Sequence, residues 1–171
     1  MRIVLFRHGP AGSRDPRRWP DDGQRPLSPR GIERTEQAAR GLVRIMPLHR
    51  IVTSPLLRAA QSAELLRKAV DSKREVEVLD ALAPGGSYHE IVTGLKEFKA
   101  SETIVLVGHE PDLGKLAAVL IFAAPARSLP LKKAGVCVID FVGGPTPGDG
   151  KLVAFLPPRF LRRRSATKAK A

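Results

Sequence analysis

Short, continuous apolar runs rich in Val and Ile alternate along this chain with longer segments in which apolar residues recur at helical spacing. This alternation is typical of an α/β sheet covered on both faces, because strands buried on both sides need apolar residues throughout. The last two runs flank the Gly- and Pro-rich segment 143–150, which predicts an antiparallel hairpin. We therefore expect an α/β fold with a mostly parallel sheet of about six strands, at residues 3–6, 50–53, 76–79, 103–107, 136–142 and 152–155.

Four segments between these strands carry helix start signals followed by amphipathic runs. Their expected first residues are Ser28-Pro29, Ser54-Pro55, Ser87 with Glu90 at capping-box spacing, and Pro111-Asp112. The third helix is expected to end near Lys99. The first helix is expected to face inward with Ile32, Ala39, Leu42, Val43 and Met46, and the second with Leu57, Ala60, Leu65 and Ala69.

Length and composition indicate one domain, because 171 residues with 43% hydrophobic content fill a single core. We place this domain at residues 1–158 and a basic tail at residues 159–171. The net charge of +12 raises the question of a nucleic-acid partner, but the tail alone holds six basic residues and no acid. Such a run is usually a solvated chain end, and aromatic residues make up only 5% of the sequence. We therefore expect no dedicated nucleic-acid role.

The cellular context follows from what the sequence lacks. The apolar run at the N-terminus leads straight into Arg7 and His8 without the cleavage site of a signal peptide. No segment approaches the roughly 18 apolar residues of a membrane span, and the single Cys137 cannot form an internal disulfide. We expect a cytoplasmic protein, a monomer, with no membrane partner.

Polar clusters follow three of the predicted strands at the point where each strand ends. They are Arg7-His8-Gly9, the segment 53–58 ending in Arg58, and Gly108-His109-Glu110. In open α/β sheets ligands bind beyond the carboxyl ends of the parallel strands. Two arginines and two histidines are therefore expected to converge there, beside helix N-termini that favour an anion.

This set of side chains can bind and transfer a phosphoryl group. The planar guanidinium forks of Arg7 and Arg58 match a phosphate dianion, and His109 adds a further donor. His8 can act as the nucleophile if a backbone acceptor holds one ring nitrogen and leaves the lone pair of the other free. Neighbouring positive charges should lower the pKa of His8 and keep it neutral, and Gly9 should let the backbone approach the phosphate closely.

Four blocks of sequence together resemble the histidine phosphatase superfamily. They are Arg7-His8-Gly9 and the segments 25–31, 53–62 and 107–111. The short length and the form of the loop look most like the SixA-type phosphohistidine phosphatases, and the resemblance extends to about residue 158. It implies a phosphoglycerate mutase-like, three-layer α/β/α sandwich. It also implies that His8 is phosphorylated during turnover, while Arg7, Arg58 and His109 bind the phosphate.

One position departs from the family pattern. The phosphoglycerate mutase branch has a glutamate proton donor after the third strand, where this chain has Ala83. An alkoxide leaving group needs a proton far more than an imidazole does, so this departure favours a phosphoramidate such as phosphohistidine over ordinary phosphate esters. If an acid is used, Glu110 and Asp80 are both candidates.

Several further residues are candidates for a role at the site. Substrate contacts are expected from Gly9, Arg25, Ser54 and Glu110. Tyr88 is expected to be solvated surface. The spacing of His, Cys, Asp and Glu matches no metal motif, so we expect neither a metal nor a cofactor.

Three functions therefore remain open from the sequence. The leading one is a phosphatase that removes phosphate from phosphohistidine in a protein through an intermediate on His8. A second is a general phosphomonoesterase for small phosphorylated metabolites or nucleotides, because the same side chains bind any terminal phosphate. A third is a noncatalytic anion-binding or nucleic-acid-binding module, against which the nucleophile-like placement of His8 argues.

Overall fold

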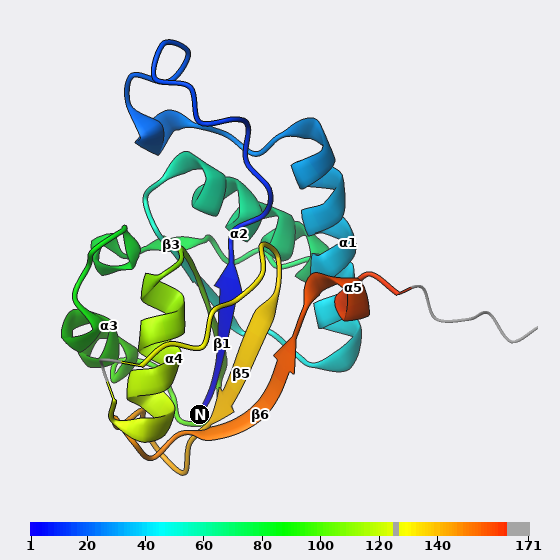
Figure 1. Cartoon of the computed structure of the whole chain (residues 1–171). Coiled ribbons are helices and arrows are strands. Elements are labelled where there is room, and N and C mark those ends of the chain that lie inside the picture. Colours follow the sequence, from blue (N-terminus) through cyan, green and yellow to red (C-terminus); the bar gives the residue numbers. More distant parts are fainter. Residues whose placement is uncertain (125–126, 164–171) are drawn as a thin grey trace, which may run out of the picture.

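A computed structural model describes residues 1–124 and 127–163, and its centre is one six-stranded sheet (Figure 1). The order of the strands is β3-β2-β4-β1-β5-β6. The first four in this order run parallel, whereas β5 is antiparallel to β1 and β6 to β5, so the predicted C-terminal hairpin is confirmed. The strands are β1 (Arg2–Arg7), β2 (Arg50–Thr53), β3 (Glu77–Val78), β4 (Thr103–Gly108), β5 (Val136–Asp140) and β6 (Lys151–Leu156).

Helices cover both faces of the sheet, which confirms the three-layer α/β/α architecture (Figure 1). One face carries α1 (Pro29–Ile45), α2 (Leu57–Val70) and the short α5 (Pro158–Leu161), and the other carries α3 (Tyr88–Leu95) and α4 (Asp112–Phe122). Two 3₁₀ turns, η1 (Asp22–Gln24) and η2 (Asp80–Leu82), lie in the loops. Within the described residues no helix has the length and apolar character needed to cross a membrane.

Each face of the sheet has its own hydrophobic core, and β1 contributes to both. Its alternate side chains Ile3 and Leu5 pack under α3 and α4, whereas Val4 and Phe6 pack under α1, α2 and α5. Continuous apolar sequence is therefore required of β1 because neither of its faces meets water.

The register of the central strands sets the positions of the functional residues. Arg7 of β1 pairs with Gly108 of β4, and Thr53 of β2 pairs with Val107 of β4. Three parallel strands thus end at the same level. The residues that follow them leave the sheet side by side at its carboxyl edge.

The predicted inward faces of the first two helices need correction. Ser28 caps α1 as expected, with its Oγ accepting from the amide of Gly31 at 3.0 Å, but Ile32 is 39% exposed. The second helix begins at Leu57 instead of Ser54, and its fully buried residues are Arg58, Ala59, Ser62, Ala63 and Leu66 instead of Leu57, Ala60 and Leu65. The predicted inward residue Ala69 is partly buried and packs against the core. The buried face of α2 is shifted because Arg58 points inward to the edge of the sheet. The small residues Ala59, Ser62 and Ala63 lie between α2 and the elements packed against it. Likewise α3 ends at Leu95, short of Lys99.

The predicted domain boundary after residue 158 falls inside α5. Leu161 of this helix is only 3% exposed and belongs to the core between the sheet and α1. A Cβ placed on Gly41 of α1 would lie 1.8 Å from the carbonyl oxygen of Leu161, so the two backbones are in close contact. Packed structure therefore continues beyond the expected boundary. Residues 164–171 of the expected tail lie outside the described residues.

Candidate active site

A cavity of about 670 Å³ opens at the carboxyl edge of the sheet. Six residues singled out from the sequence line it, from the ends of β1 and β4, the start of α2 and the loop before α1. They are Arg7, His8, Arg25, Arg58, His109 and Glu110. The structure thus brings together the four side chains expected to handle phosphate, which the sequence spreads over about a hundred residues.

His8 is held in one tautomer inside this cavity. It is 7% exposed, and its Nδ1–H donates to the carbonyl oxygen of Gly9 at 2.7 Å. The lone pair is therefore left on Nε2. Burial lowers the pKa of His8 to about 3, and the charges of His109, Arg58 and Arg7 add to the effect. The expected direction of the pKa shift is confirmed, but burial is a larger cause than the neighbouring charges. A neutral imidazole with a free lone pair is suited to nucleophilic attack.

His109 faces His8 across the cavity, with a distance of 5.0 Å between ring centroids. Its Nε2 lies 2.9 Å from Ser54 Oγ, which itself accepts from the amide of Leu56. When the Ser54 hydroxyl donates to Nε2, the ring proton of neutral His109 is on Nδ1. Burial, followed by the charge of Arg58, lowers the pKa of His109 to about 4. Ser54 therefore positions His109 instead of contacting substrate itself.

The two arginines are anchored by backbone carbonyl groups. Arg7 Nη1 donates to the carbonyl oxygen of Leu131 at 2.7 Å, and Arg58 Nη1 donates to that of Asp22 at 2.7 Å. Arg7 is thus fixed through Nη1, whereas Arg58 is also held through Nη2 by the carboxylate of Asp22. The Nε of each arginine has no hydrogen-bond partner. Fixed, always-charged forks of this kind are the usual means of binding phosphate oxygens.

Three buried side-chain nitrogens in the described part of the chain have no hydrogen-bond partner, and all three belong to this cavity. They are Arg7 Nε, Arg58 Nε and His109 Nδ1. Leaving a buried donor unpaired costs about 1–3 kcal/mol, so such groups are rare unless a ligand completes them. Each arginine Nε carries a hydrogen, and His109 Nδ1 carries one when Ser54 donates to Nε2. An oxyanion with several acceptor oxygens could accept from all of them.

Asp22 and Arg25 form the outer wall of the cavity. Arg25 is 8% exposed, and its Nε donates to Asp22 Oδ1 at 2.8 Å while Nη1 donates to the carbonyl oxygen of Gly12. Asp22 Oδ2 also lies 3.2 Å from Arg58 Nη2. The hydrogen bond from Arg25 lowers the pKa of Asp22, which is therefore ionised at neutral pH. Asp22 was not recognised as a site residue from the sequence. The one local feature that indicates it is its position three residues before Arg25.

Gly9 has a different role from the one expected. A Cβ at this position would lie 1.9 Å from Thr35 Oγ1 of α1, and the amide of Gly9 donates to Ser62 Oγ of α2 at 3.0 Å. The missing side chain therefore allows helix packing against the first loop, and the amide is already used within the protein.

The two acid candidates occupy different environments. Glu110 lines the cavity, where burial raises its pKa and its Oε1 accepts from the amide of Leu131 at 3.1 Å. Asp80 is exposed at the start of η2 and is not among the described residues that line the cavity. A carboxyl group with a raised pKa is the better proton donor near neutral pH, which favours Glu110.

Lys133 also lines the cavity and was not recognised from the sequence. Its pKa is lowered by partial burial and by the charges of Arg7, Arg25 and Arg58. The field at this edge of the sheet is therefore strongly positive and suited to a dianion.

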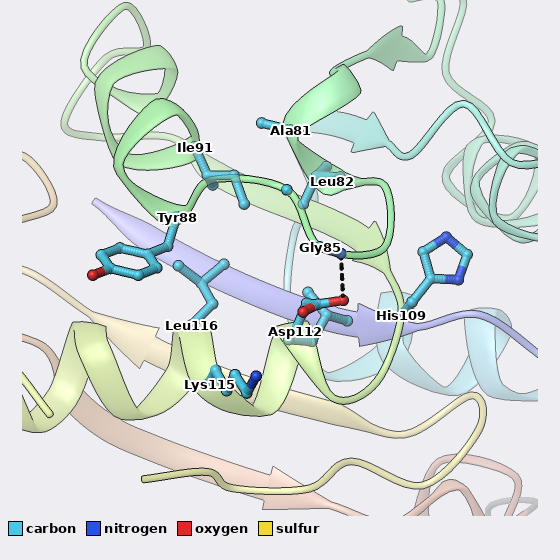
Figure 2. A pocket seen from close by; sticks show the side chains of 11 residues that line it. Ala81, Leu82, Gly85, Tyr88, Ile91, His109, Asp112, Lys115 and Leu116 are labelled. Atoms are coloured by element: carbon cyan, nitrogen blue, oxygen red, sulfur yellow. Dashed lines mark hydrogen bonds between the residues drawn. The ribbon is translucent and has the colours of Figure 1, made fainter. Parts of the chain in front are cut away.

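A smaller cavity of about 280 Å³ shares His109 with the main one (Figure 2). Its apolar lining includes Leu82 and Leu116, and Tyr88, expected to be surface, stands at its edge with 45% exposure. Asp112 projects into it and accepts a hydrogen bond from the amide of Gly85 at 3.1 Å (Figure 2). Mixed apolar and polar lining of this kind suits an organic group attached to the phosphate.

Among residues 1–124 and 127–163, no group of three or more His, Cys, Asp or Glu side chains could hold a metal ion. The positive charge around the main cavity is supplied by the arginines and Lys133.

Known proteins resemble this chain in sequence and in fold. The family model described as Histidine phosphatase superfamily (branch 1) matches residues 3–84. An uncharacterized protein from Picosynechococcus sp. is 40% identical over 139 residues, which cover 80% of this chain and 82% of that protein. A structure of the protein histidine phosphatase SixA complexed with tungstate has a TM-score of 0.79 at 24% identity, covering 94% of this chain and 99% of that one.

Other members of the same fold carry different names. The alpha-ribazole phosphatase from Shigella flexneri has a TM-score of 0.68 at 18% identity and covers 92% of this chain and 97% of that one. At these identities the structural matches establish the phosphoglycerate mutase-like fold alone. The sequence matches show that the chain belongs to the histidine phosphatase superfamily.

Proposed function

We propose that this protein removes the phosphoryl group from phosphohistidine in a protein substrate, through a phosphohistidine intermediate on His8. The observation that carries the proposal is the set of three buried, unpartnered donors on Arg7, Arg58 and His109 around a neutral His8. Members of the histidine phosphatase superfamily are phosphatases. A phosphate seated on these donors would lie within the same cavity as His8 Nε2.

The reaction runs in two steps. First, the lone pair on His8 Nε2 attacks phosphorus, the bond from phosphorus to the substrate imidazole nitrogen breaks, and that nitrogen takes up a proton. Second, water attacks phospho-His8, which releases inorganic phosphate and restores neutral His8. In both steps Arg7, Arg58 and His109 bind the oxygens on which negative charge is carried.

The nature of the leaving group supports phosphohistidine as the substrate. An imidazole leaves readily with little help, whereas a sugar or serine oxygen needs a strong acid. Ala83 follows η2 where a glutamate donor would otherwise serve. The cavity beside His109 offers room for the group that carries the phosphate.

A small phosphate ester is the second candidate, and Glu110 favours it. Its raised pKa would let it protonate an ester oxygen. Alpha-ribazole phosphatase, which shares the fold, bears a name that indicates such a substrate.

A substrate panel tests the proposal and separates the two candidates. Wild type, His8→Ala and the control His89→Ala, at an exposed histidine of α3, are assayed on a phosphohistidine peptide, an aryl phosphate and a sugar phosphate. We expect the highest kcat/KM on the phosphohistidine peptide, loss of all activity in His8→Ala and no loss in His89→Ala. Activity that survives in His8→Ala would exclude the nucleophile role.

Glu110→Gln gives an independent measure of the leaving-group chemistry. If phosphohistidine is the substrate, the variant loses less than about tenfold in kcat/KM on the peptide, against about 10²-fold or more on an unactivated ester. Equal losses on both substrates would remove the acid assignment for Glu110.

A further inference from the structure

A third cavity, of about 460 Å³, adjoins the proposed phosphate site and has a strongly basic lining. It shares Arg7 and Lys133 with the phosphate cavity. Its other basic residues are Arg34, Lys132 and Arg162, and no Asp or Glu is among the described residues that line it. The two cavities thus form one continuous basic surface that is longer than a single phosphate requires.

Three segments far apart in the sequence build this cavity. Arg34 comes from α1, Lys132 and Lys133 from the loop before β5, and Arg162 directly follows α5. Figure 1 shows α5 lying beside α1, next to the loop that leads into β5. The close backbone contact between Gly41 and Leu161 fixes this arrangement. The basic residues are therefore brought together by the packing of α5, which is part of the core.

The charges of the third cavity are not balanced by ion pairs within the described part of the chain. Arg2, Arg50 and Arg67 each form an ion pair with a carboxylate. By contrast, Arg34, Lys132, Lys133 and Arg162 take part in none of the ion pairs found among the described residues. Gathering like charges without counter-charges is unfavourable, and the cost falls when an anion binds.

We propose that the third cavity binds a second anionic group of the substrate, supplied in a protein substrate by Asp or Glu residues flanking the phosphohistidine. This inference rests on the proposed function and adds a sequence preference to it. Because Arg7 and Lys133 line both cavities, a peptide whose phosphoryl group binds Arg7 and Arg58 can extend its flanking residues, about 3.3–3.6 Å each, toward Arg34 and Lys132.

The test compares two phosphohistidine peptides that differ only in their flanks, one with Asp and Glu and the other with Asn and Gln. The enzymes are wild type, Arg34→Gln/Lys132→Gln, and the charge-matched control Lys99→Gln/Lys151→Gln, whose residues are exposed and lie outside the cavity. Neither variant alters a residue of the proposed phosphate site.

In wild type we expect kcat/KM to be about three- to tenfold higher for the acidic peptide at low salt, as two partly exposed charge pairs would give. This preference should disappear in Arg34→Gln/Lys132→Gln, remain in the control variant, and shrink at high salt. Activity on the neutral peptide should change by less than about twofold in either variant. An equal acidic-to-neutral ratio in wild type and in Arg34→Gln/Lys132→Gln would overturn the proposal.

A second readout keeps this test separate from that of the proposed function. Unphosphorylated acidic and neutral peptides are compared as inhibitors of aryl phosphate hydrolysis, which needs the phosphate site but not a phosphohistidine substrate. Stronger inhibition by the acidic peptide, lost in Arg34→Gln/Lys132→Gln, supports the anion site even if no phosphohistidine peptide is hydrolysed. The opposite result is an enzyme that prefers a sugar bisphosphate over a monophosphate and shows no effect of acidic peptide flanks. That result would overturn the proposal that a protein substrate supplies the second anionic group.

Discussion

Lowering the pH from about 7.5 to about 5 should destabilise this protein through its two active-site histidines. Both imidazoles are buried in the neutral form, which lowers the pKa of His8 to about 3 and that of His109 to about 4. In the unfolded chain each takes up a proton near the ordinary value of about 6.5. Because the unfolded state then binds more protons, the free energy of unfolding falls as the pH drops below about 6.5.

The size of the loss in stability follows from the difference between about pH 5 and the pKa of about 6.5 of a histidine in the unfolded chain. At about pH 5 the unfolded imidazoles are almost fully protonated, whereas folded His8 and His109 remain mostly neutral. A difference of about 1.5 pH units at about 1.4 kcal/mol per unit gives about 2 kcal/mol for each histidine. The two together should remove about 4 kcal/mol, a large share of the 5–15 kcal/mol typical of a domain.

The assay is urea unfolding followed by circular dichroism at about pH 7.5 and about pH 5. His8→Gln/His109→Gln cannot take up these protons, so its free energy of unfolding should fall by about 4 kcal/mol less than that of wild type between the two pH values. His89→Gln, at an exposed position, should behave like wild type. Carboxylate contributions are common to all three proteins and cancel in the comparison. If wild type and the double variant lost stability equally, within about 1 kcal/mol, the claim that both imidazoles are buried in the neutral form would be refuted.

Three further substitutions test the geometry directly. Gly9→Ala should cost about 1–3 kcal/mol in urea unfolding, because its Cβ would overlap Thr35 Oγ1, and a second substitution Thr35→Ala should recover part of that loss. Leu161→Ala should cost about 2–4 kcal/mol if α5 belongs to the core, against less than about 0.5 kcal/mol for the exposed Phe160→Ala. Arg58→Lys should lower kcat/KM on an aryl phosphate by about 10²-fold or more, because the compact ammonium group lacks the planar fork that contacts Asp22 on one side and phosphate on the other; near-normal activity would show that Arg58 does not contact the phosphate.

Much of the fold was accessible from the sequence because the central strands are buried on both faces. Residues 3–6 and 103–107 are continuous apolar runs for this reason, and the polar residues after them mark the sheet edge where ligands bind. Helix starts set by local chemistry, such as Ser28 at α1, were also predictable. Ser54 misled the prediction because the same hydroxyl that could cap a helix instead binds His109.

Features that depend on contacts between distant segments could not be read from local patterns. The pairing of Asp22 with Arg58 joins η1 to α2, and the burial of Leu161 depends on α1. Lys133 did have a signal. It precedes β5, and the start of a strand antiparallel to β1 lies at the same edge as the end of β1. The position of Lys133 at the site can therefore be predicted only once the pairing of β5 with β1 is known.

The pairing of β1 with β4 has a consequence for protein engineering. Because Arg7 and Gly108 are partners in the sheet, His8 and His109 each follow the last rung of the same ladder, and their 5.0 Å separation is close to the spacing of about 4.8 Å between neighbouring strands. Backbone repeat distance, not the surrounding loops, thus sets how far apart the reactive rings stand. Libraries that randomise residues 13–21 and 84–87, but keep Gly12 and Asp22 because they hold Arg25 and Arg58, should therefore yield new substrate preferences without rebuilding the reactive centre.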